Sequence, residues 1–542
     1  MNYGFIIDNR KCIGCHACTT ACKSEHEVPL GVNRTWVKQV EKGNFPHTRR
    51  LFSVMRCNHC TDAPCVEICP VEALFIRDDG IVDFDNKRCI GCKSCMQACP
   101  YDALYIDPET HTAAKCNYCA HRIDVGLEPA CVNVCPEHAI ISGDMENPET
   151  EIFQLLAKEQ VSVRKAAKAT KPNLFYIMGD EASLNPMETD KDGVYLWNSQ
   201  SRGVGHFAKA AEKMAFTNGD VVDALLQINN QVATQAEIAE KGKAKSIDLL
   251  MNKPRRVYDT PNKGILWGWE VSGYVLTKAI AAGVFLVLFA GLQLGYGDII
   301  TAETKWQTLV AALVFLMATG ALLVKDLDQP GRFLYVLLRP HWSSWLVRGG
   351  YAITVFGGLL TLWGLTMWFG WDGIQQVTLW ATAVLAVIAA IYTAFLFAQA
   401  KGRDFWQSPA LAIHMLTHSF MAGAAALLLL GAFGGVDAAW TGFLKTTLAI
   451  SIVVGLFTML AELATTHPTT EAKLTVETIL KGRYRMMFWI GAVLIGNIAP
   501  LAILILGGLE TLPMAVAGAL ALVGIWFTEK IWVEAPQRIP LT

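Results

Sequence analysis

The sequence has no cysteine after Cys135, and all sixteen of its cysteines lie between Cys12 and Cys135. The opening segment from Met1 to Arg10 also lacks the apolar core of a secretion signal, so we expect no signal peptide. Disulfide scaffolds are short secreted domains, and this long chain without such a signal does not fit that class. The crowded cysteines therefore predict bound metal.

Charged side chains are scarce after Gly268, where long apolar stretches follow one another. Each is long enough to cross the apolar core of a bilayer, which is about 30 Å thick, and a soluble core does not fit this pattern. The sequence predicts eight membrane spans, near 271–296, 306–325, 345–370, 377–400, 408–433, 443–465, 486–508 and 512–529. Ten tryptophans lie near the span ends, as interfacial aromatic residues do: Trp267, Trp269, Trp306, Trp342, Trp345, Trp371, Trp406, Trp440, Trp489 and Trp532.

The sixteen cysteines fall into four groups of four. The groups are Cys12-x2-Cys15-x2-Cys18-x3-Cys22, Cys57-x2-Cys60-x4-Cys65-x3-Cys69, Cys89-x2-Cys92-x2-Cys95-x3-Cys99 and Cys116-x2-Cys119-x11-Cys131-x3-Cys135. A cubane iron–sulfur cluster needs four thiolates: three closely spaced cysteines wrap one cube, and the fourth reaches the neighbouring cube. The pattern therefore predicts four [4Fe–4S] clusters with no cysteine left over.

Two other interpretations of the cysteines are weaker. Zinc sites also use cysteines spaced two residues apart, but a trailing Cys-Pro that occurs in three of the groups is not a zinc pattern. The run Cys12-Ile-Gly-Cys15-His16 matches the attachment pattern of c-type haem. Cys18 and Cys22 complete the ferredoxin run, so we interpret His16 as an incidental neighbour.

Around these motifs, residues 1–150 have the pattern of a ferredoxin-like α+β domain. Short strands at 74–76, 81–84 and 104–106 are followed by turn residues and should form hairpins, and a short helix should end at each terminal Cys-Pro. Ligand-dense segments leave little room for an apolar core. We therefore expect bound metal to supply much of this domain's folding energy.

Two further units follow the cluster domain. Residues 151–262 are polar and are predicted to form a strap and linker, with short surface helices or flexible linker at 207–214 and 232–245. Residues 263–542 are predicted to form an all-α bundle of eight transmembrane helices.

The order of the cysteine groups and the long gap between Cys119 and Cys131 resemble the electron-transfer subunits of molybdopterin oxidoreductase complexes. These include dimethyl sulfoxide, polysulfide and thiosulfate reductases, sulfite dehydrogenases and formate dehydrogenases. Spacing alone leaves open which groups exchange their fourth cysteine, and the resemblance implies that the outer groups pair with each other, as do the inner groups. The implied ligand sets are Cys12, Cys15, Cys18 with Cys135; Cys116, Cys119, Cys131 with Cys22; Cys57, Cys60, Cys65 with Cys99; and Cys89, Cys92, Cys95 with Cys69.

The second half of the chain resembles the NrfD-type family, the quinone-reactive subunit of polysulfide reductase-like complexes. The segments that carry the resemblance are Trp269-Glu-Val-Ser-Gly-Tyr274 in the first span and Asp326-Leu-Asp328-Gln-Pro330-Gly-Arg332-Phe333 after the second. In most relatives the two halves are separate polypeptides, and fusion implies a one-to-one ratio. Residues 161–176 resemble a strap that lies along the catalytic partner in such complexes; a plain linker is an equal alternative.

The resemblance implies that ubiquinone or menaquinone is the membrane substrate, and ionisable residues within the spans are the candidates to bind it. Glu270, Tyr274 and Lys278 fall on one face of the first span, and relatives use polar residues around the first two positions to hold the quinone. Lys278 departs from the usual apolar residue. It marks a proton route or, alternatively, it snorkels or pairs with an acid.

Five further ionisable residues are candidates. Asp326, Asp328 and Arg332 follow the second span, where they line the quinone pocket or form an ion-pair cluster that caps the helix. His414 and His418 share one face of the fifth span. One helix does not clamp both axial sides of one iron, so we predict no haem. Hydrogen bonding, proton relay and packing stay open for this pair.

Eight spans place both chain ends on the same side of the membrane. The loops and tail on that side carry twelve basic residues, whereas the opposite loops carry only Lys305 and Lys445. The twelve are Lys325, Arg332, Arg339, Arg348, Lys401, Arg403, Lys473, Lys481, Arg483, Arg485, Lys530 and Arg538. The positive-inside rule predicts a multi-pass inner-membrane protein with both termini and the cluster domain in the cytoplasm. Docking of the cluster domain explains part of the bias as an alternative, and some relatives place the soluble part outside.

No segment resembles a molybdopterin-containing domain, so we expect a separate catalytic partner that docks at the outer cluster pair. Nothing predicts a nucleic-acid partner. The chain is then expected to be an oxidoreductase subunit that passes electrons between that partner and the quinone pool, with sulfite oxidation and quinone reduction as the expected reaction. One alternative is quinol oxidation for the reduction of polysulfide, thiosulfate or dimethyl sulfoxide. The other is a redox-driven ion-translocating module similar to alternative complex III.

Overall fold

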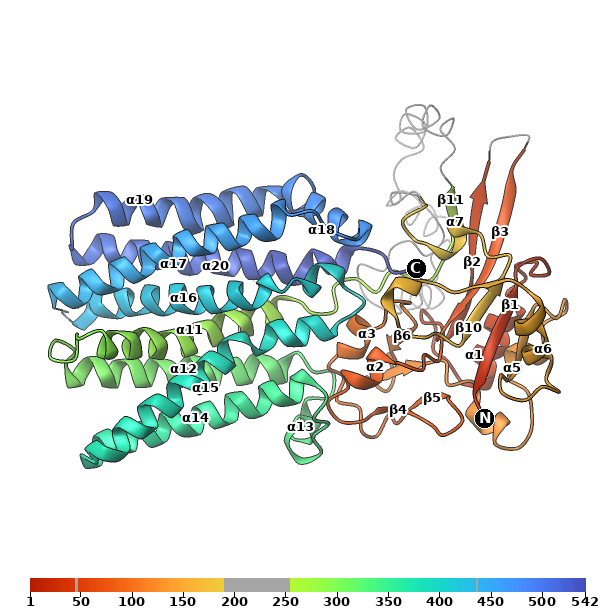
Figure 1. The fold of residues 1–542 in the computed structure, drawn as a ribbon, viewed down its shortest axis with the longest axis horizontal. Helices are drawn as coiled ribbons and strands as arrows, with labels where there is room; N and C mark the ends of the chain where they lie inside the picture. Colours follow the sequence, from red (N-terminus) through yellow and green to blue (C-terminus); the bar gives the residue numbers. More distant parts are fainter. Residues whose placement is uncertain (44–46, 190–253, 435–436) are drawn as a thin grey trace, which may run out of the picture.

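The computed structural model describes residues 1–43, 47–189, 254–434 and 437–542. It shows an elongated molecule in which a helical bundle and a smaller half of sheets and short helices lie end to end (Figure 1). The fold class predicted from the sequence is confirmed: an α+β iron–sulfur half precedes a helical membrane half. The helices expected at 207–214 and 232–245 lie outside the described residues.

A four-stranded sheet organises the far end of the iron–sulfur half. Its strands, in spatial order, are β8 (Ile140–Asp144), β1 (Tyr3–Asp8), β10 (Leu174–Ile177) and β9 (Val161–Ser162). β1 pairs antiparallel with β8 and parallel with β10. The segment expected to form a strap outside residues 1–150 therefore contributes two strands to the same sheet as the amino-terminal strand.

A three-stranded sheet lies beside it, in the order β11 (Arg255–Tyr258), β2 (Thr35–Lys42) and β3 (Arg49–Arg56). β2 and β3 form an antiparallel pair in continuous register from Thr35 opposite Arg56 to Lys42 opposite Arg49. β11 comes directly before the membrane bundle in the chain. The stretch expected to be a linker thus ties the bundle to this sheet.

Short hairpins and helices hold the cysteines. The predicted hairpins are present, as β4 (Leu74–Ile76) with β5 (Val82–Phe84) and β6 (Leu104–Ile106) with β7 (Ala113–Lys115). The short helices are α1 (Ala17–Glu25), α2 (Pro64–Glu67), α3 (Ser94–Ala98), α4 (Ala120–Ile123) and α5 (Ala130–Asn133). α2, α3 and α5 each end just before a Cys-Pro pair, as predicted.

The iron–sulfur half has a larger apolar core than the cysteine density suggests. Phe5, Trp36, Val54, Leu174 and Tyr176 are almost fully buried in one cluster with side chains of both sheets. These residues come from strands that lie between or outside the cysteine groups. The expectation that metal replaces an apolar core therefore holds only for the ligand segments themselves.

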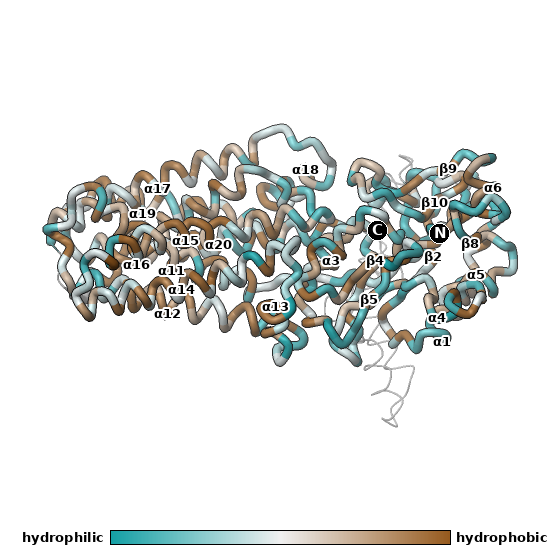
Figure 2. Tube along the Cα trace, turned by 60° about the horizontal axis from the view of Figure 1, so that its bottom comes forward, coloured by the Kyte–Doolittle hydropathy of each residue, from teal (hydrophilic) through white to brown (hydrophobic). Residues whose placement is uncertain are grey.

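Among the described residues, eight helices are long and apolar enough to cross a membrane, the number that the sequence predicted. The helices are α11 (Trp269–Gln293), α12 (Ala302–Lys325), α14 (Trp345–Phe369), α15 (Asp372–Gln399), α16 (Ala410–Gly434), α17 (Ala438–Ala464), η4 (Met487–Ile498) continued by α19 (Ala499–Leu506), and α20 (Thr511–Glu534). Hydrophobic residues dominate this half of the molecule (Figure 2). Shorter helices α13 (Tyr335–Leu338) and α18 (Thr470–Leu480) lie at the end of the bundle next to the iron–sulfur half (Figure 1).

Two glycines set the centre of the bundle, where α11 and α16 are the most buried spans. A Cβ on Gly283 would lie 1.8 Å from the Ser419 carbonyl oxygen, and a Cβ on Gly423 would lie 2.1 Å from the Gly283 carbonyl carbon. Only hydrogen atoms fit between the two backbones. Small residues at such crossings let membrane helices pack closely where no hydrophobic force drives them together.

The tryptophans divide into two classes that the sequence did not separate. Trp269, Trp342, Trp371 and Trp489 are exposed, as interfacial residues should be. Others that were expected at the lipid interface are buried instead: Trp267, Trp406, Trp440 and Trp532. Trp267 and Trp406 stack with their ring centroids 5.5 Å apart. These two tryptophans, Trp267 and Trp406, belong to the packed junction between the two halves.

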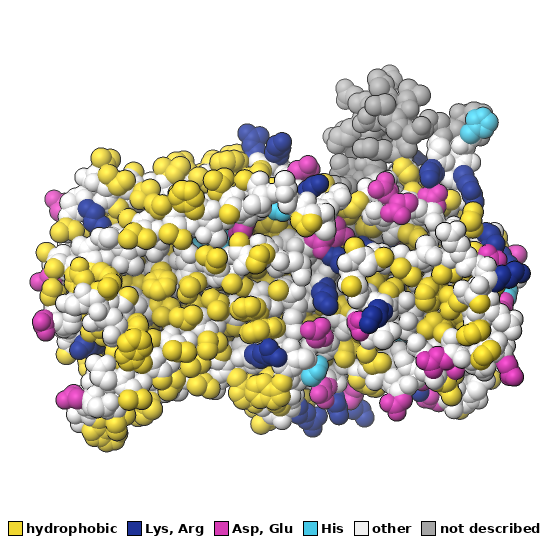
Figure 3. Space-filling view, viewed as in Figure 1, with side chains coloured by type: hydrophobic (Ala, Val, Ile, Leu, Met, Phe, Trp, Pro, Cys, Tyr) yellow, Lys and Arg dark blue, Asp and Glu magenta, His cyan; other side chains and the backbone are white. Residues whose placement is uncertain are grey.

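Basic loop residues on the same side join the bundle to the iron–sulfur half. Arg332 donates from Nη1 to the carbonyl oxygens of Asn86 and Cys89, both at 2.9 Å. Arg403 donates from Nε to Gln97 Oε1 at 3.0 Å. Charged side chains are concentrated on the iron–sulfur half and at the junction, whereas the bundle surface is largely hydrophobic (Figure 3). Docking therefore accounts for part of the basic bias.

Candidate functional site

Cysteines from distant parts of the chain converge in the iron–sulfur half. Cys12, Cys15 and Cys18 line one small cavity together with Cys135. Cys89, Cys92 and Cys95 line another together with Cys69. Each cavity thus receives three cysteines of one motif and the last cysteine of a different motif, which is the crossed arrangement implied by the resemblance.

The other two ligand sets also gather. Cys22 lies within electrostatic range of three thiols from the last group, Cys116, Cys119 and Cys131. Cys65 lies within electrostatic range of Cys57, Cys60 and Cys99. The two cavities each gather one predicted set of four cysteines, and the other two ligand sets stay predictions.

The chemistry around the thiols fits iron–sulfur ligation. Backbone N–H groups of Gly91 and Ala113 donate to Cys89 Sγ at 3.4 and 3.3 Å. Burial raises the pKa of the Cys92 thiol to about 12, so this site without a cation favours the neutral thiol. Metal-bound thiols are deprotonated, and N–H donors then stabilise the sulfur charge. The donor set therefore suits a cubane cluster better than free thiols.

A buried cation and a histidine ring lie against the sulfurs at the second outer set. Arg56 is fully buried and donates from Nη1 to Cys131 Sγ at 3.1 Å. His26 Nε2 lies 3.1 Å from Cys119 Sγ. Hydrogen bonds and positive charge near the sulfurs raise a cluster's reduction potential. The sequence analysis missed both residues, although Arg56 directly precedes a ligand.

A cavity of about 300 Å³ lies where the iron–sulfur half meets the bundle. Its walls come from α11, α12, α13, α14, α15 and the cysteine loop that carries Cys92. The lining is mostly apolar, with five polar side chains: Ser94, Tyr274, Asp326, Thr354 and Tyr392. Cys92 lines both this cavity and the cluster cavity of Cys69, Cys89 and Cys95. A flat apolar molecule in the larger cavity would therefore sit next to a cluster ligand.

Two of the predicted quinone-site residues line this cavity, namely Tyr274 and Asp326. Burial raises the pKa of the Asp326 carboxyl to about 7; Lys93 opposes the shift, and the carboxylates of Glu270 and Asp328 add to it. Asp326 can therefore gain or lose a proton near neutral pH. This combination of an apolar wall, a hydroxyl and a titratable acid suits a quinone ring.

Lys278 lies one helical turn deeper than Tyr274. Its Nζ donates to the Ala390 carbonyl oxygen at 3.0 Å and to Thr393 Oγ1 at 2.6 Å, and it lies 4.5 Å from the centroid of the Tyr392 ring. Lys278 is 1% exposed, so it does not snorkel to the surface. It supports the wall of the cavity through Tyr392.

Glu270 and Arg332 do not line the cavity. Glu270 is half-buried at the start of α11, with Lys325 at 3.8 Å. Arg332 and Asp328 hold the cysteine loop instead, because Asp328 pairs with Lys93 at 3.3 Å and its backbone N–H donates to the Gly91 carbonyl. Gly91 has a φ of +70°, and a Cβ there would lie 2.7 Å from Asp328. This motif therefore docks the cluster loop.

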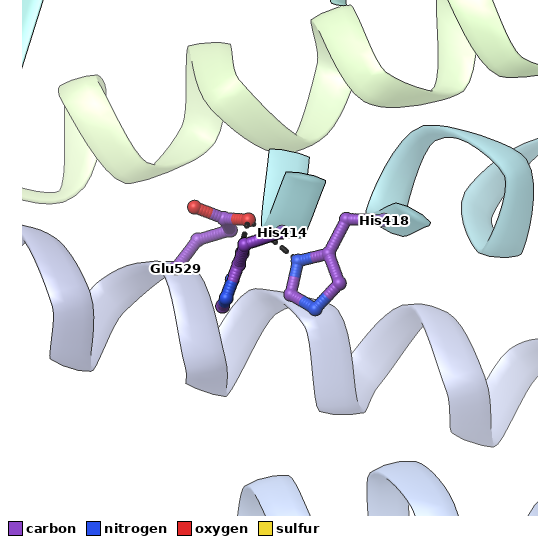
Figure 4. Close-up of side chains that lie close together, drawn as sticks. All are labelled: His414, His418 and Glu529. Atoms are coloured by element: carbon purple, nitrogen blue, oxygen red, sulfur yellow. Dashed lines mark hydrogen bonds and ion pairs between the residues drawn. The ribbon is translucent and has the colours of Figure 1, made fainter. Parts of the chain in front are cut away.

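His414 and His418 do not line this cavity, and Figure 4 shows both side chains beside Glu529 of α20. His414 Nδ1 is 2.9 Å from Glu462 Oε2 on α17. His418 Nδ1 is 2.7 Å from Glu529 Oε1 on α20. Plain packing, the alternative left open for these histidines, does not describe this buried polar network. The sequence analysis missed both acids, which lie at the ends of apolar runs.

The fold and the site together define an iron–sulfur protein with a multi-pass membrane half. Residues 5–70 and 48–145 each match the 4Fe–4S dicluster domain, and residues 259–535 match the family described as polysulphide reductase, NrfD. The chain therefore belongs to the NrfD polysulphide reductase family, with its membrane half fused to a dicluster-type iron–sulfur half.

Several proteins similar to the iron–sulfur half are named as subunits of sulfur-compound reductases. A tetrathionate reductase subunit of Salmonella typhimurium is 44% identical over 189 residues, which cover 34% of this chain and 76% of that protein. A polysulfide reductase chain of Wolinella succinogenes is 42% identical over 180 residues, which cover 32% of this chain and 93% of that protein. The thiosulfate reductase electron transfer subunit of Salmonella typhi is 39% identical over 176 residues, which cover 32% of this chain and 91% of that protein.

Proposed function

We propose that this chain is the electron-transfer and membrane-anchor subunit of a respiratory oxidoreductase complex that exchanges electrons with the quinone pool. The observation that carries the proposal is the position of Cys92, which lines both the innermost cluster cavity and the apolar cavity of the bundle. The expected architecture assigns residues 1–150 to the clusters and residues 263–542 to the quinone site, and in the structure β9 and β10 join the sheet of the cluster half.

The residues of this chain account for the binding of a quinone ring. A [4Fe–4S] cluster, when bound, supplies one-electron transfer. Tyr274 and Asp326 offer a hydroxyl and a carboxyl to the ring oxygens, and the apolar lining excludes water from the ring. Asp326, with its pKa of about 7, accepts a proton from a quinol or returns one to a quinone. We propose four clusters, one for each set of four cysteines.

The outer end of the cluster series is the place for a catalytic partner. Cys15 is exposed, unlike most of the other cysteines, and the neighbouring Ile13 is an exposed large hydrophobic residue. An exposed ligand and an apolar side chain favour electron exchange with a docked protein. We propose that this partner holds molybdopterin, as the resemblance implies.

We propose that electrons flow from quinol to the partner. The similar proteins reported above are named as tetrathionate, polysulfide and thiosulfate reductase subunits, and these names favour the reducing direction. Sulfite oxidation, which was expected from the sequence, has no specific support. On the basic bias of the loops, which docking explains only in part, we also propose that the iron–sulfur half lies in the cytoplasm.

The test compares Tyr274→Phe with a matched control, Tyr351→Phe. Tyr351 lies on α14 and donates to the Leu337 carbonyl, but it does not line the cavity. Loss of the Tyr274 hydroxyl should slow oxidation of a short-chain quinol about tenfold, because one hydrogen bond to the ring oxygen is lost. Cluster reduction by dithionite should stay normal in both variants. Unchanged quinol oxidation in Tyr274→Phe would remove this cavity from the function.

A further inference from the structure

Four ionisable side chains form a buried network in the bundle that the electron route does not use. They are His414 and His418 on α16, Glu462 on α17 and Glu529 on α20, and all are buried. Ionisable groups inside a membrane bundle are costly, and where they occur they mark proton or ion pathways more often than packing.

One end of this network opens to the junction between the halves. A second cavity, of about 510 Å³, lies between the bundle loops and the segment around Lys168. Its lining is polar and includes Lys168, Asp404, His467 and Glu462. Glu462 thus belongs both to the buried network and to a cavity outside the membrane spans.

The middle of the network consists of direct and near contacts. Glu462 Oε2 accepts from Trp532 Nε1 at 2.9 Å and lies 2.9 Å from His414 Nδ1. His414 Nε2 lies 3.9 Å from Glu529 Oε1. Glu462 Oε1 and His414 Nε2 have no hydrogen-bond partner among the described residues. Both atoms are therefore open to take or give a proton.

The other end of the network reaches the quinone cavity. Helix α20 packs against α11, and Glu529 on α20 attracts the Lys278 side chain on α11. Lys278 Nζ donates to Thr393 Oγ1 and lies over the Tyr392 ring, and Tyr392 lines the quinone cavity. Charged or polar groups therefore follow one another from the junction cavity to the quinone cavity, on five different helices.

We propose that Glu462, His414, Glu529 and Lys278 form a proton route between the junction cavity and the quinone cavity. The proposal rests on the proposed quinone site. Oxidation of one quinol releases two protons and two electrons. The electrons pass one at a time to the cluster side, one proton passes to Asp326, and the other passes to Lys278 and along the route to the junction. Quinone reduction uses the same route in reverse.

A metal ion is the competing occupant of the network. Ligand atoms of His414, His418 and Glu529 lie within 4.8 Å of one another. The structure favours the proton route, because His418 Nδ1 and Glu529 Oε1 are already in hydrogen-bond contact at 2.7 Å.

The experiment uses Glu462→Gln in the full chain, with Glu534→Gln as the matched control. Glu534 is also a buried acid near the junction, but it binds the Tyr484 hydroxyl and lines neither cavity. Glu462→Gln should slow quinol oxidation about tenfold or more, because proton transfer then limits turnover. Glu534→Gln should keep the wild-type rate, and the clusters of both variants should accept electrons from dithionite normally.

Chemical rescue separates a proton route from a structural role. A small weak acid such as hydrazoic acid should restore the rate of Glu462→Gln several-fold, because it carries protons past the missing carboxylate. The same acid should not restore Tyr274→Phe, whose defect lies in the quinone site. A slow Glu462→Gln variant that the acid does not rescue would overturn the proton route.

Three further outcomes are decisive. One equivalent of a tightly bound divalent metal other than iron, lost in His418→Ala, would overturn the route and assign a metal site. A wild-type rate in Glu462→Gln together with a slow Tyr274→Phe would overturn the route but keep the quinone site. Wild-type rates in both variants would remove the proposed function itself.

Discussion

At the residue scale, the cavity next to the cluster ligand Cys92 is made by side chains of very different predictability. Tyr274 and Asp326 stand in segments with a recognisable pattern, and the structure places both in the cavity wall. Tyr392 and Glu529 each stand in or at the end of a long apolar stretch, where nothing in the local sequence says which way a side chain faces. Their roles depend on which helices pack together, and a hydropathy pattern does not contain that information.

If Asp326 takes the quinol proton as proposed, it should make quinol oxidation pH-dependent. Its pKa of about 7 means that it is protonated below neutrality and ionised above it. Because an ionised carboxylate accepts the quinol proton, the rate should rise with pH through about 7. Asp326→Asn should lose that rise, whereas Asp328→Asn, which removes a partner of Lys93 outside the cavity, should keep it. A pH–rate profile of Asp326→Asn identical to that of the wild type would contradict this role.

At the scale of the elements, the membrane helices were predictable and the long-range strands were not. Eight uninterrupted apolar stretches correspond to the eight spans within a few residues. The hairpins formed by β4 with β5 and by β6 with β7 also follow from local turn residues. The parallel pairing of β1 with β10 joins Phe5 to Leu174, and no local pattern reports a contact so distant in the chain. The boundary expected at residue 150 therefore cuts through a sheet.

The crossing of α11 and α16 gives a prediction for this scale. Gly423→Ala would place a methyl group 2.1 Å from the Gly283 backbone, and overpacking of this kind costs about 1–3 kcal/mol. The variant should therefore unfold at a lower temperature in detergent. Gly442→Ala on α17 has open space around its Cβ and should be as stable as the wild type or slightly more stable. Equal Tm values for Gly423→Ala and the wild type would show that the two backbones separate without cost.

At the scale of the whole molecule, the four predicted sets of cysteines give an expected cofactor content. Four cubane clusters require about sixteen iron and sixteen sulfide ions per chain. Metal analysis of the purified chain should find this content together with a broad absorption near 400 nm. About eight irons per chain would mean that only two of the four sets hold clusters, and zinc in their place would contradict iron–sulfur ligation.

The segment between β9 and β10 binds the bundle to the iron–sulfur half through ion pairs and a hydrogen bond. Lys165 pairs with Glu471 at 2.6 Å, Lys168 pairs with Asp404, and Arg164 donates to the Leu541 carbonyl at 3.1 Å. Some electron carriers deliver charge by swinging a head domain from donor to acceptor. These contacts hold the two halves together, so the proposed cluster and quinone sites should stay at a fixed distance and no such swing is expected. Electron delivery should then be insensitive to solvent viscosity, and only quinone diffusion should feel the fluidity of the lipid.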